Sequence, residues 1–125
     1  MTQYQMLGLR VLGDCDVGAI EQFEFYKGEE RTIRLQVYDK EDNQRYPLES
    51  GVDVLILTLP GSPDDVEIAN TDITVDTNNP SIISALLQEI QTDVMVSGFA
   101  ILKIVKGTVT RYAMGERIIK RIQMS

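Results

Sequence analysis

Alternation of apolar and polar side chains over residues 32–38 constrains the fold of this chain more than any other feature. Ile33, Leu35 and Val37 occupy every second position, and polar residues stand between them. In an extended chain, this period of two places the apolar side chains on one face and the polar ones on the other. The segment therefore predicts a half-buried β-strand.

Further strand candidates follow at short intervals. Residues 52–59 (VDVLILTL) form a β-branched, nearly continuous apolar run that predicts a central strand covered on both faces. Turn-forming stretches separate the candidates, and only residues 86–94 fit a single helical turn. Several short strands without βαβ alternation predict an all-β sandwich or barrel. The remaining candidates are residues 81–87, 99–105, 111–114 and 117–122, the last two separated by a bulge or turn at Gly115.

The N-terminal residues predict an arm outside the main domain. Residues 4–12 read as an extra strand, and residues 13–19 (GDCDVGA) read as a flexible join. A chain of 125 residues has the size of one domain and buries enough surface to fold without a disulfide or a metal. We therefore expect a strand or arm with its join at 1–18 and a β-sandwich at 19–125.

The single cysteine and the N-terminal sequence bear on where the chain is made. Cys15 has no second cysteine with which to form an internal disulfide. The N-terminus lacks a basic start followed by an apolar run, and the apolar runs fall far short of the roughly 18 residues that a membrane span needs. We expect synthesis in the cytoplasm, without a signal peptide and without a membrane-spanning segment.

The charge of the chain is negative and unevenly distributed. Twelve basic against 19 acidic residues give a net charge of −7, which repels phosphate and disfavours nucleic-acid and anionic membrane partners. Basic residues concentrate after Ile101, however. They form either an edge strand protected from aggregation by its charge or a surface that docks on acidic groups of a partner or a neighbouring copy.

Catalytic chemistry has little support in the sequence. The chain has no histidine, the side chain most often used as a general base near neutral pH and the commonest metal ligand. Ser62 lies outside a G-x-S-x-G frame, and without histidine it cannot belong to a Ser-His-Asp triad. Cys15 stands between Asp14 and Asp16, whose charges disfavour a reactive thiolate. We expect no enzymatic activity, no catalytic residue and no cofactor.

Acidic loops raise the question of a calcium site. Asp39, Glu41 and Asn43 have the alternate spacing with which a loop can wrap oxygen ligands around a cation. The sharp-turn glycine and the closing glutamate of an EF-hand loop are missing from this stretch. Asp and Asn are also the ordinary residues of turns, so we expect solvated turns and no metal here or at residues 72–79.

Aromatic residues divide into two groups. Those in alternating runs are expected in the core: Phe23, Phe25 and Phe99. Three tyrosines are either exposed interface anchors or residues that pack along the sheet: Tyr4, Tyr38 and Tyr46.

The order of five features carries a family resemblance. They are FYKGEE at 25–30, the alternating strand and acidic hairpin at 33–42, LESGVDV at 48–54, the run at 82–87 with its turn at Thr92 and Asp93, and GFA at 98–100. In this order, residues 23–122 resemble the small immunoglobulin-like (Ig-like) domain of phage virion proteins, including the N-terminal domain of upper-baseplate proteins. The resemblance implies an Ig-like antiparallel β-sandwich with a short helical turn and an N-terminal strand or arm.

The same resemblance implies a function. It points to a non-enzymatic structural protein of a phage particle, made in the host cytoplasm and placed in the virion as a capsid decoration, a neck or tail adaptor, or a baseplate component. Its partners would be other virion proteins and copies of itself, bound by pairing of the arm with a neighbour's sheet edge and by the basic C-terminal strand. The residues expected to make these contacts are Tyr4, Met6, Leu7, Leu9, Arg111, Arg117, Lys120 and Arg121.

Two alternative functions stay open at this point. One is a carbohydrate-binding or receptor-binding β-sandwich module, since such domains often carry sites on their loops, although the chain has no tryptophan. The other is a calcium-dependent accessory domain of an enzyme. A small-molecule ligand is not expected.

Overall fold

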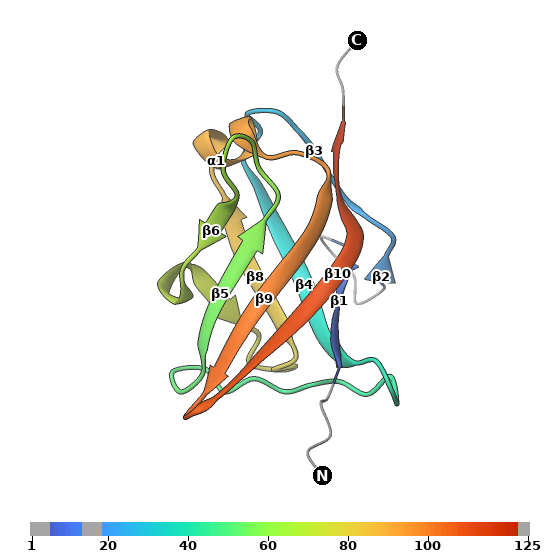
Figure 1. The fold of residues 1–125 in the computed structure, drawn as a ribbon, viewed down its shortest axis with the longest axis vertical. Helices are drawn as coiled ribbons and strands as arrows, with labels where there is room; N and C mark the ends of the chain where they lie inside the picture. The colour runs from blue at the N-terminus through green and yellow to red at the C-terminus, as the bar shows by residue number, and fades with distance from the viewer. Residues whose placement is uncertain (1–5, 14–18, 123–125) are drawn as a thin grey trace.

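Extended strands make up most of the computed structural model, which describes residues 6–13 and 19–122 (Figure 1). The all-β prediction is confirmed. The strands are β1 (Leu7–Leu12), β2 (Ala19–Ile20), β3 (Phe23–Tyr26), β4 (Arg31–Asp39), β5 (Val54–Leu59), β6 (Val66–Ile68), β7 (Ile73–Val75), β8 (Ile82–Leu87), β9 (Gly98–Lys106) and β10 (Val109–Ile122). A 3-10 turn, η1 (Asn70–Asp72), and a short helix, α1 (Glu89–Val94), complete the described elements.

The strands form two layers that β1 joins along one side. The hydrogen-bonded order is β6-β5-β9-β10-β1-β4-β8-β7, so one layer holds β6, β5, β9 and β10 and the other holds β4, β8 and β7 (Figure 1). Strand β1 runs antiparallel to β4 and parallel to β10, whereas β3 pairs in parallel with the last residues of β10. The fold is therefore an Ig-like sandwich closed into a near-barrel on the β1 side.

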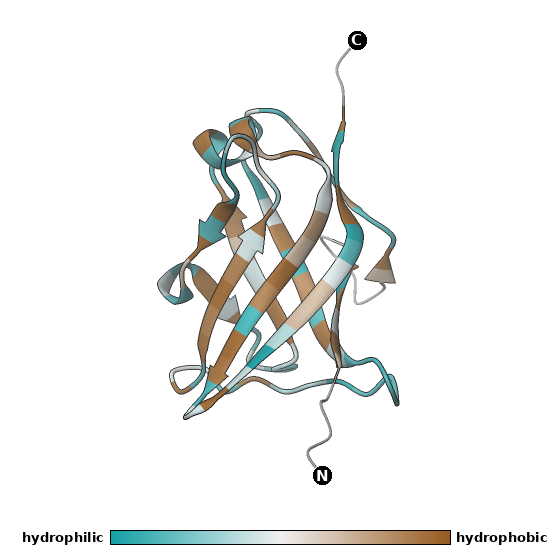
Figure 2. Cartoon of the chain, viewed as in Figure 1, coloured by the Kyte–Doolittle hydropathy of each residue, from teal (hydrophilic) through white to brown (hydrophobic). Residues whose placement is uncertain are grey.

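Alternation along the strands builds the core between the layers. In β4, the predicted residues Ile33, Leu35 and Val37 are buried, together with alternate residues of β8 beside it and of β5 and β9 in the other layer. Figure 2 shows apolar residues recurring along β5 and β9 and hydrophilic residues along the connection that follows β4. Each fully buried aliphatic side chain contributes roughly 1.5–3 kcal/mol, so this core supplies the main driving force for folding.

Strand β1 belongs to the same core. Leu7 and Leu9, expected to contact a neighbouring copy, are each only 3% exposed and pack in the domain's own interior, together with Val11. Tyr4, the rest of residues 1–5 and residues 14–18 of the predicted join lie outside the described residues. Among the residues that the structure does describe, the segment predicted as a strand or arm forms a strand of the sandwich, β1.

A stacked pair of side chains ties β1 to β4 on the outer surface. The Tyr38 ring lies over Gly8, where an added Cβ would be 2.6 Å from Tyr38 Cζ. The Arg10 guanidinium lies 3.9 Å from the centroid of the same ring, and Arg10 Nη2 donates a hydrogen bond of 2.6 Å to Asn43 Oδ1. Glycine at position 8 thus leaves room for a contact that joins β1, β4 and the following turn.

Two predictions about burial are wrong. Phe99 was expected in the core, but it is 51% exposed on the outer face of β9. Residues 52–59 were expected to be covered on both faces, but β5 starts at Val54, which is 46% exposed, and the strand alternates between core and surface. In both segments apolar residues occupy the two faces, and only one face meets the opposite layer.

The predicted bulge and helical turn are confirmed. The C-terminal candidates form one strand, β10, whose register with β9 shifts between Gly115 and Ile119, and Arg117 there has a φ of 54°. Helix α1 opens with a capping box between Gln88 and Gln91. Among the residues that the structure describes, no helix has the length and apolar character needed to cross a membrane.

If β1 is part of the sandwich, truncating one of its buried side chains lowers the stability of the whole domain. We expect Leu9→Ala to lower the free energy of unfolding by about 2–5 kcal/mol, because it removes buried methyl groups and leaves a cavity. The exposed Ile20→Ala in β2 is the control and should stay within about 0.5 kcal/mol of the wild type. Urea unfolding measures both, and equal, small effects would mean that β1 does not pack as described.

Candidate protein-interaction surface

Apolar side chains gather on the outer face of β5, β9 and β10. The most exposed are Phe99 and Tyr112, at 51% and 58%, and Val54 and Met114 are exposed on the same face. They lie outside because β9 and β10 turn Ala100, Leu102 and Ala113 toward the core, which leaves the alternate residues on the surface. We call this surface the outer face.

Strand pairing arranges the outer face in rows. Tyr112 lies opposite Lys103, and Lys103 opposite Ile56, so a cation stands between two apolar side chains. The rows on either side are also mostly apolar: Thr110, Val105 and Val54 on one side, and Met114, Ile101 and Thr58 on the other. Contiguous exposed apolar patches of this kind on a folded domain mark interaction surfaces.

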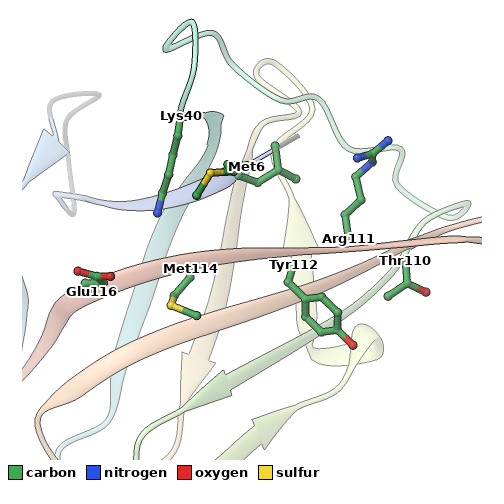
Figure 3. Close-up of a pocket in the computed structure, with 8 residues that line it drawn as sticks. Met6, Lys40, Thr110, Arg111, Tyr112, Met114 and Glu116 are labelled. Atoms are coloured by element: carbon green, nitrogen blue, oxygen red, sulfur yellow. The ribbon is translucent and has the colours of Figure 1, made fainter. Parts of the chain in front are cut away.

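A groove runs along the border of the outer face. Its volume is about 530 Å³, and Met6, 59% exposed, projects from the start of β1 into it. Figure 3 shows Lys40, Met6 and Arg111 on one side of β10, and Tyr112 and Thr110 on the other. The lining residues are Met6, Leu7, Lys40, Thr110, Arg111, Tyr112, Met114 and Glu116. The groove and the outer face are therefore continuous through β10.

The edge of β10 beside this groove is partly open. On that edge β1 pairs only with Ala113 and Met114, and β3 pairs only from Ile119 onward. Within the described part of the chain, residues 109–112 have no partner strand on that side. Open edges offer N–H and C=O groups to an added strand, so the groove has the geometry for β-augmentation.

The ends of the outer face differ in charge. Toward the β9–β10 hairpin stand Lys103, on the face itself, and Arg111, in the groove. Toward α1, Glu116 follows Gly115, while Glu67 lies opposite Thr58 in the row of Ile101. In the portion of the chain that is described, neither Lys103 nor these two glutamates takes part in an ion pair.

A second lysine at the hairpin end is already paired. Lys106 Nζ lies 2.7 Å from Asp53 Oδ2, and the Asp53 side chain is 3% exposed. The same carboxylate oxygen accepts the Glu49 N–H at 2.8 Å, and Lys106 also donates to the Pro47 carbonyl oxygen at 3.3 Å. This network fixes the loop before β5 against β9, which leaves Lys103 as the cation that the outer face presents.

The structure brings some predicted interface residues together and separates others. Met6, Leu7 and Arg111 share the groove. Arg117 lies in the bulge, where its carbonyl oxygen accepts a hydrogen bond from Gln22. Lys120 is next to Glu24 of β3, and the Arg121 N–H donates to the Ser97 hydroxyl group. The basic C-terminal residues therefore occupy different stretches of β10 and do not form one patch with Arg111.

Sequence reasoning missed the outer face itself. A signal for this apolar surface is present in residues 99–105 (FAILKIV). Both sets of alternate positions in this stretch are apolar, apart from Lys103. Such a double pattern indicates that one apolar face stays outside if the strand is covered by only one layer. Tyr112 and Met114 alternate with the small residue Ala113 in the same way.

The acidic loops use their oxygens within turns. Asp39 Oδ1 accepts the Glu41 N–H at 2.9 Å, and Asn43 accepts a hydrogen bond from Arg10. Asp76 Oδ1 likewise accepts the N–H groups two and three residues further along the chain. No group of three or more His, Cys, Asp or Glu side chains in residues 6–13 and 19–122 is placed to hold a metal ion. These contacts are those of the turns that the sequence predicts.

Comparison with known proteins bears on the fold of this chain and on nothing else. No family model matches the chain, and no curated protein matches it. The solution structure of the Ig-like domain of human leucine-rich repeat-containing protein 4 is similar over 100% of this chain and 96% of that one, with 8% identity and a TM-score of 0.41. A chimeric titin Z1Z2 carrying an exogenous KLER peptide from decorin is similar over 94% and 98%, with 8% identity and a TM-score of 0.39. At such identity and TM-scores, these likenesses bear on neither partner nor activity.

The Asp53–Lys106 network predicts a contrast between two acidic substitutions. Asp53→Ala should lower the free energy of unfolding by about 2 kcal/mol, because it deprives a loop N–H and a partly buried ammonium of their acceptor. Asp93 pairs with Lys27 at 3.9 Å with both side chains more than half exposed, so Asp93→Ala should cost less than about 1 kcal/mol. Thermal unfolding of the two variants compares them, and a smaller loss for Asp53→Ala than for Asp93→Ala would contradict the network.

Proposed function

We propose that this chain is a non-enzymatic protein-interaction domain that binds through the outer face and the adjoining groove. The observation that carries the proposal is the gathering of Phe99, Tyr112, Met114 and Val54, all exposed, on one side of a sandwich whose core is otherwise filled. An aromatic side chain that is half exposed leaves on the order of 100 Å² to bury, which is worth roughly 2–3 kcal/mol in an interface.

The shape of the surface favours a protein partner over a small molecule. The outer face is one side of a sheet, and small-molecule sites are enclosed cavities with a few convergent polar groups. A largely apolar sheet face that exposes aromatic residues and a methionine instead matches a protein interface, in which these residues are enriched. The net charge of −7 supports a protein partner in place of a nucleic acid.

Within this class, we propose that the chain is a structural component of a phage particle, as a capsid decoration, neck or tail adaptor, or baseplate protein. The support is the order of sequence features from residue 23 to residue 122 that resembles the Ig-like domain of phage virion proteins. A sandwich with an open strand edge and an apolar face suits such a role, because both can be covered by neighbouring subunits.

Particle labelling tests this proposal. Gold-conjugated antibody against the chain should label virus particles purified from the culture that produces it, at a fixed position on each particle. Label found only on soluble protein, with bare particles, would contradict a virion role.

Incorporation of variants tests the surface. We expect Phe99→Ser together with Tyr112→Ser to reduce the amount of chain in purified particles at least about tenfold, since these side chains are the proposed anchors. Leu86→Ser is the matched control, because Leu86 is 49% exposed on β8 of the opposite layer. Equal incorporation of both variants would rule out the outer face as the binding surface.

A further inference from the structure

We propose that the outer face pairs with the outer face of a second copy of this chain, with the strands of the two copies running in opposite directions. This inference rests on the proposed function, since it names the partner of the same surface. It goes further by fixing the orientation, which follows from where the charges stand on the face.

Size and composition make the face suitable for a copy of itself. Strands β5, β9 and β10 with their side chains from Phe99 to Val105 span roughly 20 Å along the strands and 10–15 Å across them. Two such faces pack as the layers of a sandwich do, about 10 Å apart, with their apolar rows interdigitated. Because a standard interface buries about 800 Å² per partner, this smaller patch predicts a dimer that forms and dissociates with concentration.

One orientation of the two copies is disfavoured by Lys103. If the strands of both copies ran in the same direction about an axis along β9, Lys103 would face Lys103 of the second copy across an apolar contact. Two like charges brought together and away from water repel each other and cost affinity. Among the described residues, no acidic group pairs with Lys103 within its own chain to offset this.

The opposite orientation pairs unlike charges. When the second copy is turned about an axis across β9 near Ile101, the hairpin end of one face covers the α1 end of the other. Lys103 then approaches Phe99 and Glu116 of the second copy, so a ring face and a carboxylate both become available to the ammonium. A two-fold axis makes this contact twice. The unpaired Lys103 and the unpaired Glu116 thus become each other's partners.

Sedimentation velocity of the full chain over a range of concentrations tests for the dimer. We expect a monomer–dimer equilibrium that Tyr112→Ser shifts to monomer and that Leu86→Ser leaves unchanged. Both substituted positions are exposed, and melting curves confirm that each variant is folded. A wild-type chain that remains monomeric at every concentration overturns the proposal.

Charge reversal tests the orientation. Lys103→Glu places two glutamates together at each contact, so dimerisation should weaken at least about tenfold. Glu116→Lys should weaken it likewise, and the double variant Lys103→Glu/Glu116→Lys should restore it. If the strands ran in the same direction, Lys103→Glu would only replace a pair of lysines with a pair of glutamates. Adding Glu116→Lys would then not restore dimerisation, and that result would overturn the proposed orientation.

Self-pairing and the virion role can fail independently of each other. A monomeric chain that is nevertheless incorporated into particles, and loses incorporation with Phe99→Ser and Tyr112→Ser, overturns self-pairing and leaves the proposed function standing. A chain that dimerises as described but is absent from particles overturns the virion role and leaves the self-pairing standing.

Discussion

The position of β1 between β4 and β10 is the constraint on which the rest of the structure depends. Its backbone pairs with one strand of each layer, and its apolar side chains fill the space between them. Without it, the β4 and β10 edges would be open and the core would meet water along one side. The close approach of the Tyr38 ring to Gly8 and the Arg10 contact above it hold the strand in place.

That position also shapes the candidate surface. Since β1 covers β10 only at Ala113 and Met114, the hairpin end of β10 keeps an open edge, and Met6 projects beside it into the groove. The bulge between Gly115 and Ile119 then turns the remainder of β10 toward β3. The apolar outer face is left on the layer formed by β5, β9 and β10, because no described element covers it.

Local features of the fold could be predicted from the sequence. The alternation around Leu35 identified β4, and the apolar run at residues 52–59 identified β5, because period and turn chemistry act over a few residues. The bulge was predicted from Gly115 for the same reason. The short strands β6 and β7 were not predicted, since three residues carry too little pattern.

The site was harder to predict, because it depends on contacts between distant segments. Alternation shows which residues share a face but does not show which face is inside, so Phe99 was assigned to the core although it lies outside. Leu9 was assigned to a strand or arm outside the main domain, because its partners in β4 lie more than twenty residues away. Arg111 and Arg117 looked like parts of one basic strand, and the bulge places them in different surroundings.

Hydrogen–deuterium exchange on the full chain tests the central claim, that β1 is an integral strand of the sandwich, most directly. Amides paired in the middle of a sheet exchange only when the structure opens. We predict that the amides of β1 are protected as strongly as those of β4, its antiparallel partner. Rapid exchange throughout β1 while β4 stays protected would contradict the account and would return β1 to the role of a detachable arm.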